Sequence, residues 1–258
     1  MAGARPRVAR TAPGESVTSR ALSVLDAFDE QHAALTLSQV ARRSGLPVAT
    51  AHRRLADLVD SRLLYRRADG RYEIGARMWH LGLLSRPTTM REAALPHLQD
   101  LVSLTGLTTH VAVLDGLAAL VVDRIGGSRT VLTRHSPGGR LPLYCTAVGK
   151  VLLAFAPAAV QDQALRALVA HTRHTITDPE AIRRQIREID RTRLASSRQE
   201  HRDGVASIAV PVFRGGTVVA SVGLLAPLSA GVHKHVETLR SCSAQVARTL
   251  EALERANP

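Results

Sequence analysis

Residues 36–75 constrain the fold more than any other stretch, because signals for two helices and a hairpin follow one another there. Thr36 stands three residues before Gln39, which predicts a capping box in which each side chain accepts from the other residue's backbone N–H. Gly45 is expected to end this first helix, since glycine readily adopts the positive φ found at helix ends. Pro47 then opens a second helix at a position that favours proline. Together these signals predict two short helices joined by a tight turn.

The second helix and the residues after it complete a familiar outline. Asp69-Gly70 separates two short runs, 63–67 and 71–74, and an Asp-Gly pair in that place indicates a β-hairpin. Helix, turn, helix and hairpin together form a winged helix-turn-helix, whose second helix is narrow enough to enter the major groove of DNA. Apolar residues at helical spacing predict the buried face of that helix: Ala51, Leu55, Leu58 and Val59.

The polar residues of this stretch are candidates for contacting DNA. Side chains in the first turns of the second helix can reach base edges or phosphates, and arginines on the hairpin suit phosphates or the minor groove. The net charge of +12 favours a polyanionic partner, although a helical domain with a solvated basic face remains an alternative. The predicted contacts are Ser38, Gln39, Thr50, His52, Arg53, Arg54, Arg66, Arg67 and Arg71.

At these residues the chain resembles the IclR family of bacterial transcriptional regulators. The resemblance lies in residues 16–25 (SVTSRALSVL), in Gly45-Leu46-Pro47 with His52-Arg53-Arg54-Leu55, and in Tyr72-Glu73-Ile74-Gly75. It implies that the protein binds operator DNA as a homodimer or a tetramer. It also implies a second domain that senses a small organic effector.

The rest of the chain predicts an α+β fold for that second domain. Asp115-Gly116 and Gly215-Gly216 each separate two apolar, β-branched runs, and helices intervene without strict strand–helix alternation, which favours an antiparallel sheet flanked by helices. A further strand is predicted at 131–133. The resemblance implies a GAF-like architecture for this domain. We predict a disordered basic tail at 1–13, the winged helix-turn-helix at 14–78, a linker helix at 79–91 and the effector domain at 92–258.

The effector pocket is predicted from the resemblance alone. In the family, small ligands sit between the sheet and the helix that follows Leu141-Pro142. Relatives that sense small carboxylates can carry Asp and Cys at the positions of Ser197 and Ser207, and Ser at the positions of Gly223 and Leu225. This chain is therefore expected to bind a less polar ligand. A plain core without a ligand is the alternative. The matching positions are Leu141, Ala147, Val148, Ser197, Ser207, Gly223 and Leu225.

Other chemistry has weaker support in the sequence. The competing hypothesis is a GAF-fold enzyme that uses Cys145 as nucleophile, with His135 or His201 as base and the N-terminal domain as a protein-interaction module. A core cysteine fits the flanking residues better. The pairs His171/His174 and His233/His235 lack the cysteine or carboxylate neighbours of a zinc site, so we predict no metal and no other cofactor. No apolar run is long enough to span a membrane, and two cysteines suggest no disulfide framework. A cytoplasmic protein without catalytic residues is therefore expected.

Overall fold

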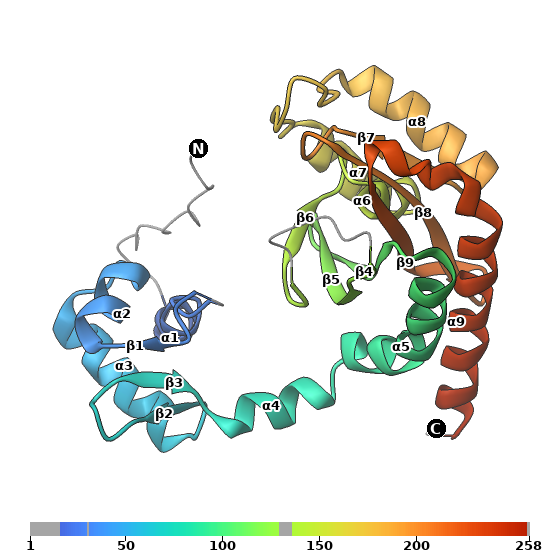
Figure 1. Cartoon of the computed structure of the whole chain (residues 1–258). Helices are drawn as coiled ribbons and strands as arrows, with labels where there is room; N and C mark the ends of the chain where they lie inside the picture. The colour runs from blue at the N-terminus through green and yellow to red at the C-terminus, as the bar shows by residue number, and fades with distance from the viewer. Residues whose placement is uncertain (1–15, 30, 129–135, 257–258) are drawn as a thin grey trace. The chain divides into compact units, whose positions relative to one another are not determined.

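The computed structural model describes residues 16–29, 31–128 and 136–256. It divides into two compact units, Met1–Ser85 and Arg86–Pro258, which are treated separately (Figure 1). The predicted tail at 1–13, the predicted strand at 131–133 and the candidate base His135 lie outside the described residues.

The N-terminal unit has the predicted winged helix-turn-helix order. It packs three helices against a small antiparallel sheet with strand order β1-β3-β2. Its core joins Val24, Val40, Leu55 and Leu64 with other apolar residues from each of these helices. The elements are α1 (Val17–Leu25), β1 (Ala34–Leu35), α2 (Leu37–Ser44), α3 (Val48–Asp60), β2 (Leu64–Arg66), β3 (Tyr72–Ile74) and α4 (Ala76–Leu83).

Local contacts fix where α2 begins and ends and where α3 begins. The capping box is confirmed, since Thr36 N–H donates to Gln39 Oε1 at 2.8 Å and Gln39 N–H donates to Thr36 Oγ1 at 3.3 Å. Gly45 has φ 70° and its N–H donates to Ala41 O, so the turn needs the positive φ that glycine adopts without strain. Pro47 is the N-cap of α3 rather than its first residue.

The linker prediction needs a correction, because residues 79–91 do not form one helix. α4 ends at Leu83 and α5 (Arg86–Thr105) begins after a break at Leu84 and Ser85. Pro87 explains the break, since proline lacks the N–H that would bond to the preceding turn and disfavours helical φ/ψ in the residue before it. α4 leaves its apolar side chains exposed, and the only tryptophan, Trp79, is 72% accessible.

The C-terminal unit is built on a six-stranded antiparallel sheet with order β6-β5-β4-β9-β8-β7. One face packs against α5 and α9, which run side by side in Figure 1. The other face packs against α6, with α7 and α8 outside it. The elements are α5, β4 (Thr108–Asp115), β5 (Ala118–Ile125), β6 (Arg140–Pro142), α6 (Ala147–Ala154), α7 (Ala158–Leu165), α8 (Pro179–Thr192), β7 (Ala195–Arg198), β8 (Val205–Arg214), β9 (Thr217–Pro227), the 3₁₀ turns Leu228–Ala230 and Val232–His235, and α9 (Val236–Ala256).

One irregularity in this sheet matters for the site. β4 pairs with β5 through Val111–Asp123 and then Ala112–Val121, so Val122 has no partner and forms a β-bulge. A bulge places two successive residues on the same side of the strand and reverses the alternation beyond it. Asp123 consequently reaches Arg91 of α5 at 3.0 Å, and Arg124 turns to the opposite face of the sheet.

Candidate DNA-binding surface and effector pocket

The exposed face of α3 carries the best-placed candidates for reading bases. His52 and Arg53 are exposed, while Ala51 and Leu55 are fully buried on the opposite side. Ala49 and Ala56 are exposed on the same side as Arg53, one turn before and after it. The sequence prediction omitted these alanines because they carry no polar group, but small side chains here let a helix approach the floor of the groove.

The other four predicted contacts on these helices differ in how available their side chains are. Thr50 is half-buried, and Gln39 already accepts from Thr36 in the capping box. Arg54 has a side chain only 11% accessible and pairs with Asp57 at 2.9 Å, so it braces α3 rather than projecting from it. Ser38, at the start of α2, is exposed.

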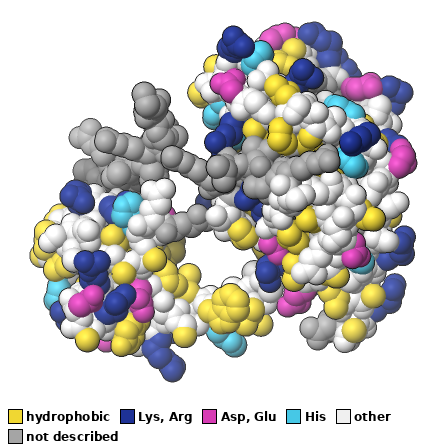
Figure 2. Space-filling model, viewed as in Figure 1, with side chains coloured by type: hydrophobic (Ala, Val, Ile, Leu, Met, Phe, Trp, Pro, Cys, Tyr) yellow, Lys and Arg dark blue, Asp and Glu magenta, His cyan; other side chains and the backbone are white. Residues whose placement is uncertain are grey.

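The predicted hairpin is confirmed, and its arginines are exposed but not isolated. Arg66 lies over the Tyr72 ring at 5.7 Å, while Arg67 and Arg71 lie 3.7 and 3.9 Å from Asp69. Figure 2 shows basic and acidic side chains close together on this unit. Exposed pairs of this length contribute at most about 1 kcal/mol, so phosphates can displace them.

The second candidate site is a pocket between the sheet and α6. Its empty space, open mouth included, is about 550 Å³. Of the seven predicted positions, Leu141, Ala147, Ser197, Ser207 and Leu225 line this pocket, and Val148 and Gly223 do not. A Cβ on Gly223 would stand 2.8 Å from both His110 Nε2 and Val148 Cγ1. The full lining is His110, Arg124, Leu141, Thr146, Ala147, Ser197, His201, Arg202, Val205, Ser207 and Leu225.

Four basic residues of this lining were not in the predicted set: His110, Arg124, His201 and Arg202. Arg124 is half-buried, and burial lowers its pKa from the ordinary value, yet a guanidinium stays charged at neutral pH. The bulge at Val122 is what brings Arg124 here, and simple strand alternation could not have found it. The pocket therefore combines apolar walls with basic side chains and hydroxyl groups.

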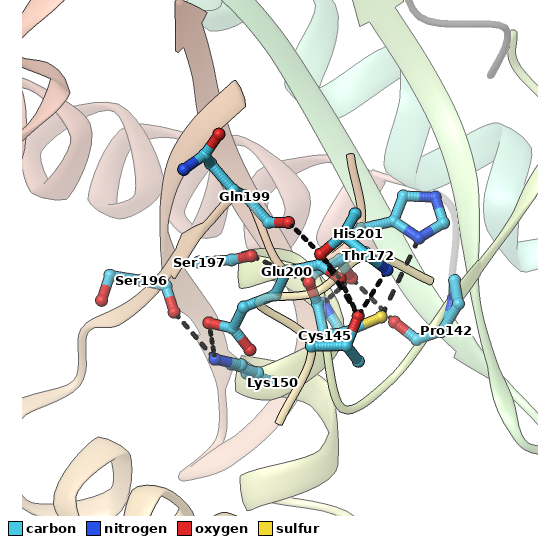
Figure 3. A network of polar contacts seen from close by, with 12 residues as sticks. Pro142, Cys145, Lys150, Thr172, Ser196, Ser197, Gln199, Glu200 and His201 are labelled. Atoms are coloured by element: carbon cyan, nitrogen blue, oxygen red, sulfur yellow. Dashed lines mark hydrogen bonds and ion pairs between the residues drawn. The ribbon is translucent and has the colours of Figure 1, made fainter. Parts of the chain in front are cut away.

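The N-terminus of α6 is held in place by several polar contacts (Figure 3). Thr146 caps the helix: its hydroxyl accepts from Gly149 N–H at 3.1 Å and donates to Pro142 O at 2.8 Å. Ser197 Oγ donates to Cys145 O at 2.8 Å. These bonds fix the wall formed by Ala147 against β6 and β7.

A buried ion pair continues this network. Lys150 Nζ lies 2.6 Å from Glu200 Oε1 and donates to Ser196 O at 3.1 Å. Burial lowers the pKa of Lys150 and raises that of Glu200, and the opposite charge of each partner counters both shifts. The pair ties the interior of α6 to the segment that follows β7.

The structure brings Cys145 and His201 together, with 3.9 Å between Sγ and Nδ1. Burial, followed by the negative charge of Glu200, raises the pKa of the Cys145 thiol to about 12, so the thiol stays protonated and is a poor nucleophile. His171 lies beside this pair, its ring centroid 4.9 Å from that of His201. His174 instead meets Gln199 at 3.2 Å, so His171 and His174 do not form the pair considered from the sequence.

Within the described parts of the chain, no helix is long and apolar enough to cross a membrane. Both cysteines, Cys145 and Cys242, are buried and free of disulfides.

Comparison with known proteins covers both units. Residues 17–68 match the model of the IclR helix-turn-helix domain, and residues 84–249 match that of the bacterial transcriptional regulator IclR C-terminal domain. The probable transcriptional regulator SauR of Cupriavidus necator is 33% identical over 218 residues, covering 81% of this chain and 85% of that protein. The Pca regulon regulatory protein of Pseudomonas putida is 33% identical over 226 residues, covering 83% and 73% respectively.

A solved structure resembles this one closely. It is an IclR homolog from Microbacterium hydrocarbonoxydans complexed with 4-hydroxybenzoate, with a TM-score of 0.87 and 32% identity, covering 92% of this chain and 100% of that chain.

Proposed function

The chain belongs to the IclR family of bacterial transcriptional regulators, and from that premise we propose which part of it binds DNA and which part binds an effector. The exposed face of α3 reads an operator in double-stranded DNA, and the wing of β2 and β3 contacts the phosphates. The pocket beside α6 binds a small organic carboxylate that modulates operator binding. The single observation that carries the effector class is the placement of Arg124 in a pocket that also has apolar walls.

The DNA half of the proposal rests on exposure and charge. Arg53 and His52 project from the first half of α3, the part of a recognition helix that contacts base edges. Arg66, Arg67 and Arg71 carry exposed positive charge on the hairpin, where non-specific phosphate contacts strengthen binding and make it salt-dependent.

The effector half rests on the chemistry of the pocket. A guanidinium binds a carboxylate through two parallel N–H···O bonds, which are stronger than neutral hydrogen bonds. Ser197 and Ser207 add hydroxyl groups, and Leu141, Val205 and Leu225 form the apolar walls, which suit an aromatic or short aliphatic body. The neighbouring structure holds 4-hydroxybenzoate, a ligand of this kind. We therefore favour an anionic effector over the less polar one expected from the sequence.

Calorimetric titration tests the effector class. Benzoate and 4-hydroxybenzoate should bind, and the uncharged methyl ester of 4-hydroxybenzoate should not. Arg124→Gln should weaken carboxylate binding by about 1.5–3 kcal/mol, the range for a hydrogen bond to a charged group, which is about 10- to 150-fold in Kd. Arg187→Gln, an exposed arginine of α8 outside the pocket, is the matched control. Equal binding of acid and ester would contradict the proposal.

The remaining parts of the proposal concern organisation. We propose that the DNA-binding domain spans 14–78, that the linker runs from residue 79 to the break at Leu84 and Ser85, and that the effector domain begins with α5 at Arg86. We also propose that the protein has no catalytic activity, which the raised pKa of Cys145 supports. We further propose that the protein is cytoplasmic, because a bacterial transcriptional regulator must reach the DNA. Homodimers, or tetramers made from them, would match the two-fold symmetry of palindromic operators. The exposed apolar side chains around α4 offer a surface for dimerisation (Figure 2): Trp79, Leu81, Leu83 and Leu84.

A further inference from the structure

Three side chains of types that can ligate metals are far apart in the sequence but meet at the edge of the pocket. Cys145 precedes α6, His171 lies in the segment between α7 and α8, and His201 follows β7. One ligand atom from each lies within 4.8 Å of the other two. Figure 3 shows the His201 ring pointing at the Cys145 sulfur, at 3.9 Å.

We propose that Cys145, His171 and His201 form a binding site for a zinc ion. One thiolate sulfur and two imidazole nitrogens are ligands that zinc prefers, whereas magnesium and calcium prefer oxygen. With Zn–S of about 2.3 Å and Zn–N of about 2.0–2.1 Å, ligand atoms of a tetrahedral site lie about 3.3–3.6 Å apart. The observed separations, at most 4.8 Å, need only small side-chain rotations to close around the ion.

The segments that carry the ligands are held together without a metal. Thr172 Oγ1 donates to Gln199 O and Thr175 Oγ1 donates to Glu200 O, each at 2.6 Å. These bonds join the segment of His171 to that of His201. Ser197 Oγ bonds to the carbonyl of Cys145 itself. The backbone is therefore already arranged around the proposed site, which lowers the entropy lost when a metal binds.

Tyr144 supplies an outer contact that orients His171. Its hydroxyl donates to Val169 O at 2.7 Å and accepts from Val169 N–H at 2.9 Å. With its one proton used, the hydroxyl can only accept from His171 Nε2, which lies 3.1 Å away. This arrangement leaves the lone pair on Nδ1 of His171. Histidines that bind metals commonly donate their other N–H to such a partner, which fixes the tautomer.

Metal binding here exchanges one proton for one ion. The Cys145 thiol loses its proton to solvent as its sulfur bonds to zinc, and a coordinating thiol is deprotonated even when its own pKa is high. Both histidines bind as neutral imidazoles, and burial lowers the pKa of His171. The site would hold zinc with three protein ligands, and its fourth position would take a water molecule or another oxygen or nitrogen donor.

Cobalt substitution tests the site in the full-length, untagged protein after treatment with a chelator. Co²⁺ should bind with one equivalent per chain, with the visible bands of a tetrahedral ion and the near-ultraviolet charge-transfer band of a single thiolate. Binding of Co²⁺ to the metal-free protein should release one proton per ion from the thiol, and Zn²⁺ should then displace Co²⁺ without further proton release. Cys145→Ser should abolish the charge-transfer band, and His171→Ala and His201→Ala should each abolish stoichiometric binding.

Matched variants separate the site from unspecific binding. Cys242 is also buried, with a thiol pKa also raised to about 12, and it lies on α9, so Cys242→Ser should keep the band. His174→Ala should keep it as well, since His174 faces Gln199. Absence of a thiolate band in the parent protein overturns the proposal even if the Cys145 variant fails to fold. Loss of the band in Cys242→Ser but not in Cys145→Ser, or binding that needs His233 or His235, would equally overturn it.

Discussion

Replacing Gly149 with alanine should destabilise the C-terminal unit, against the usual effect of this change. Alanine in place of glycine normally stabilises a helix interior by about 1 kcal/mol. Here the added Cβ would lie 2.4 Å from Pro142 O, 2.5 Å from Thr146 Oγ1 and 2.7 Å from Leu143 Cα. Two of these three neighbours are backbone atoms, so neither can rotate away.

The magnitude follows from setting the two effects against each other. Overpacking a tight interior costs typically about 1–3 kcal/mol, and a backbone contact belongs at the upper end. Subtracting about 1 kcal/mol of helix propensity leaves a net loss of about 2 kcal/mol. For a unit of this size, about 2–4 °C in Tm accompanies each kcal/mol, so the melting temperature should fall by about 4–8 °C.

Differential scanning calorimetry measures this change, with Gly82→Ala as the matched control. Gly82 also lies inside a helix, α4, but a Cβ there would meet nothing within 4 Å, so that variant should be unchanged or slightly more stable. A Gly149→Ala protein that melts at or above the parent temperature would refute the steric argument. Such a result would show that the backbone of the turn between β6 and α6 can shift at little energetic cost.

Three further predictions address DNA reading, the buried ion pair and the pocket. Arg53→Ala should weaken binding to the operator by about 1–3 kcal/mol and relax sequence specificity, whereas Arg71→Ala should weaken binding to all DNA alike and reduce the salt dependence of the binding constant by about one unit of slope. Fluorescence anisotropy on operator and random duplexes measures both. Normal operator binding by Arg53→Ala would show that the recognition helix has been misplaced. Lys150→Met leaves Glu200 buried without its partner and should lower the free energy of unfolding by about 3–5 kcal/mol. In urea unfolding, the double variant that adds Glu200→Leu should recover much of that loss. No recovery would mean that Lys150 acts mainly by packing. Ala147→Phe should fill the pocket but keep DNA binding, so the variant should lose the roughly 2.7 kcal/mol of stabilisation that ligand at a hundred times its Kd gives the parent protein. If the ligand still raised the thermal stability of the variant fully, the effector would bind elsewhere.

The sequence by itself determined the local features of this protein. The capping box of Thr36 and Gln39, the positive φ of Gly45 and the hairpin at Asp69-Gly70 depend on residues within a few positions of one another, and all three are confirmed. The cap of α8 is equally local, since the Asp178 side chain accepts from the backbone N–H groups of Glu180 and Ala181. Short-range hydrogen bonds and backbone preferences decide such features, so they can be deduced residue by residue.

The short strands β1, β6 and β7 could not be predicted from the sequence. Each has only 2–4 residues, too few for a period to be recognised, and each exists because a longer neighbour offers hydrogen bonds. The α+β architecture was deduced correctly, since the hairpins that build it are local. The order of strands across the sheet required the contacts themselves.

Only the tertiary structure decided the charge of the pocket and the meeting of Cys145, His171 and His201. A single unpaired residue, Val122, sends Asp123 towards α5 and Arg124 into the pocket. Strict alternation would have turned Asp123 towards the pocket instead. The three proposed zinc ligands come from segments joined by threonine hydroxyls to backbone carbonyls. Register shifts and contacts between distant segments depend on how the whole sheet and its covering helices pack, which no local pattern in the sequence records.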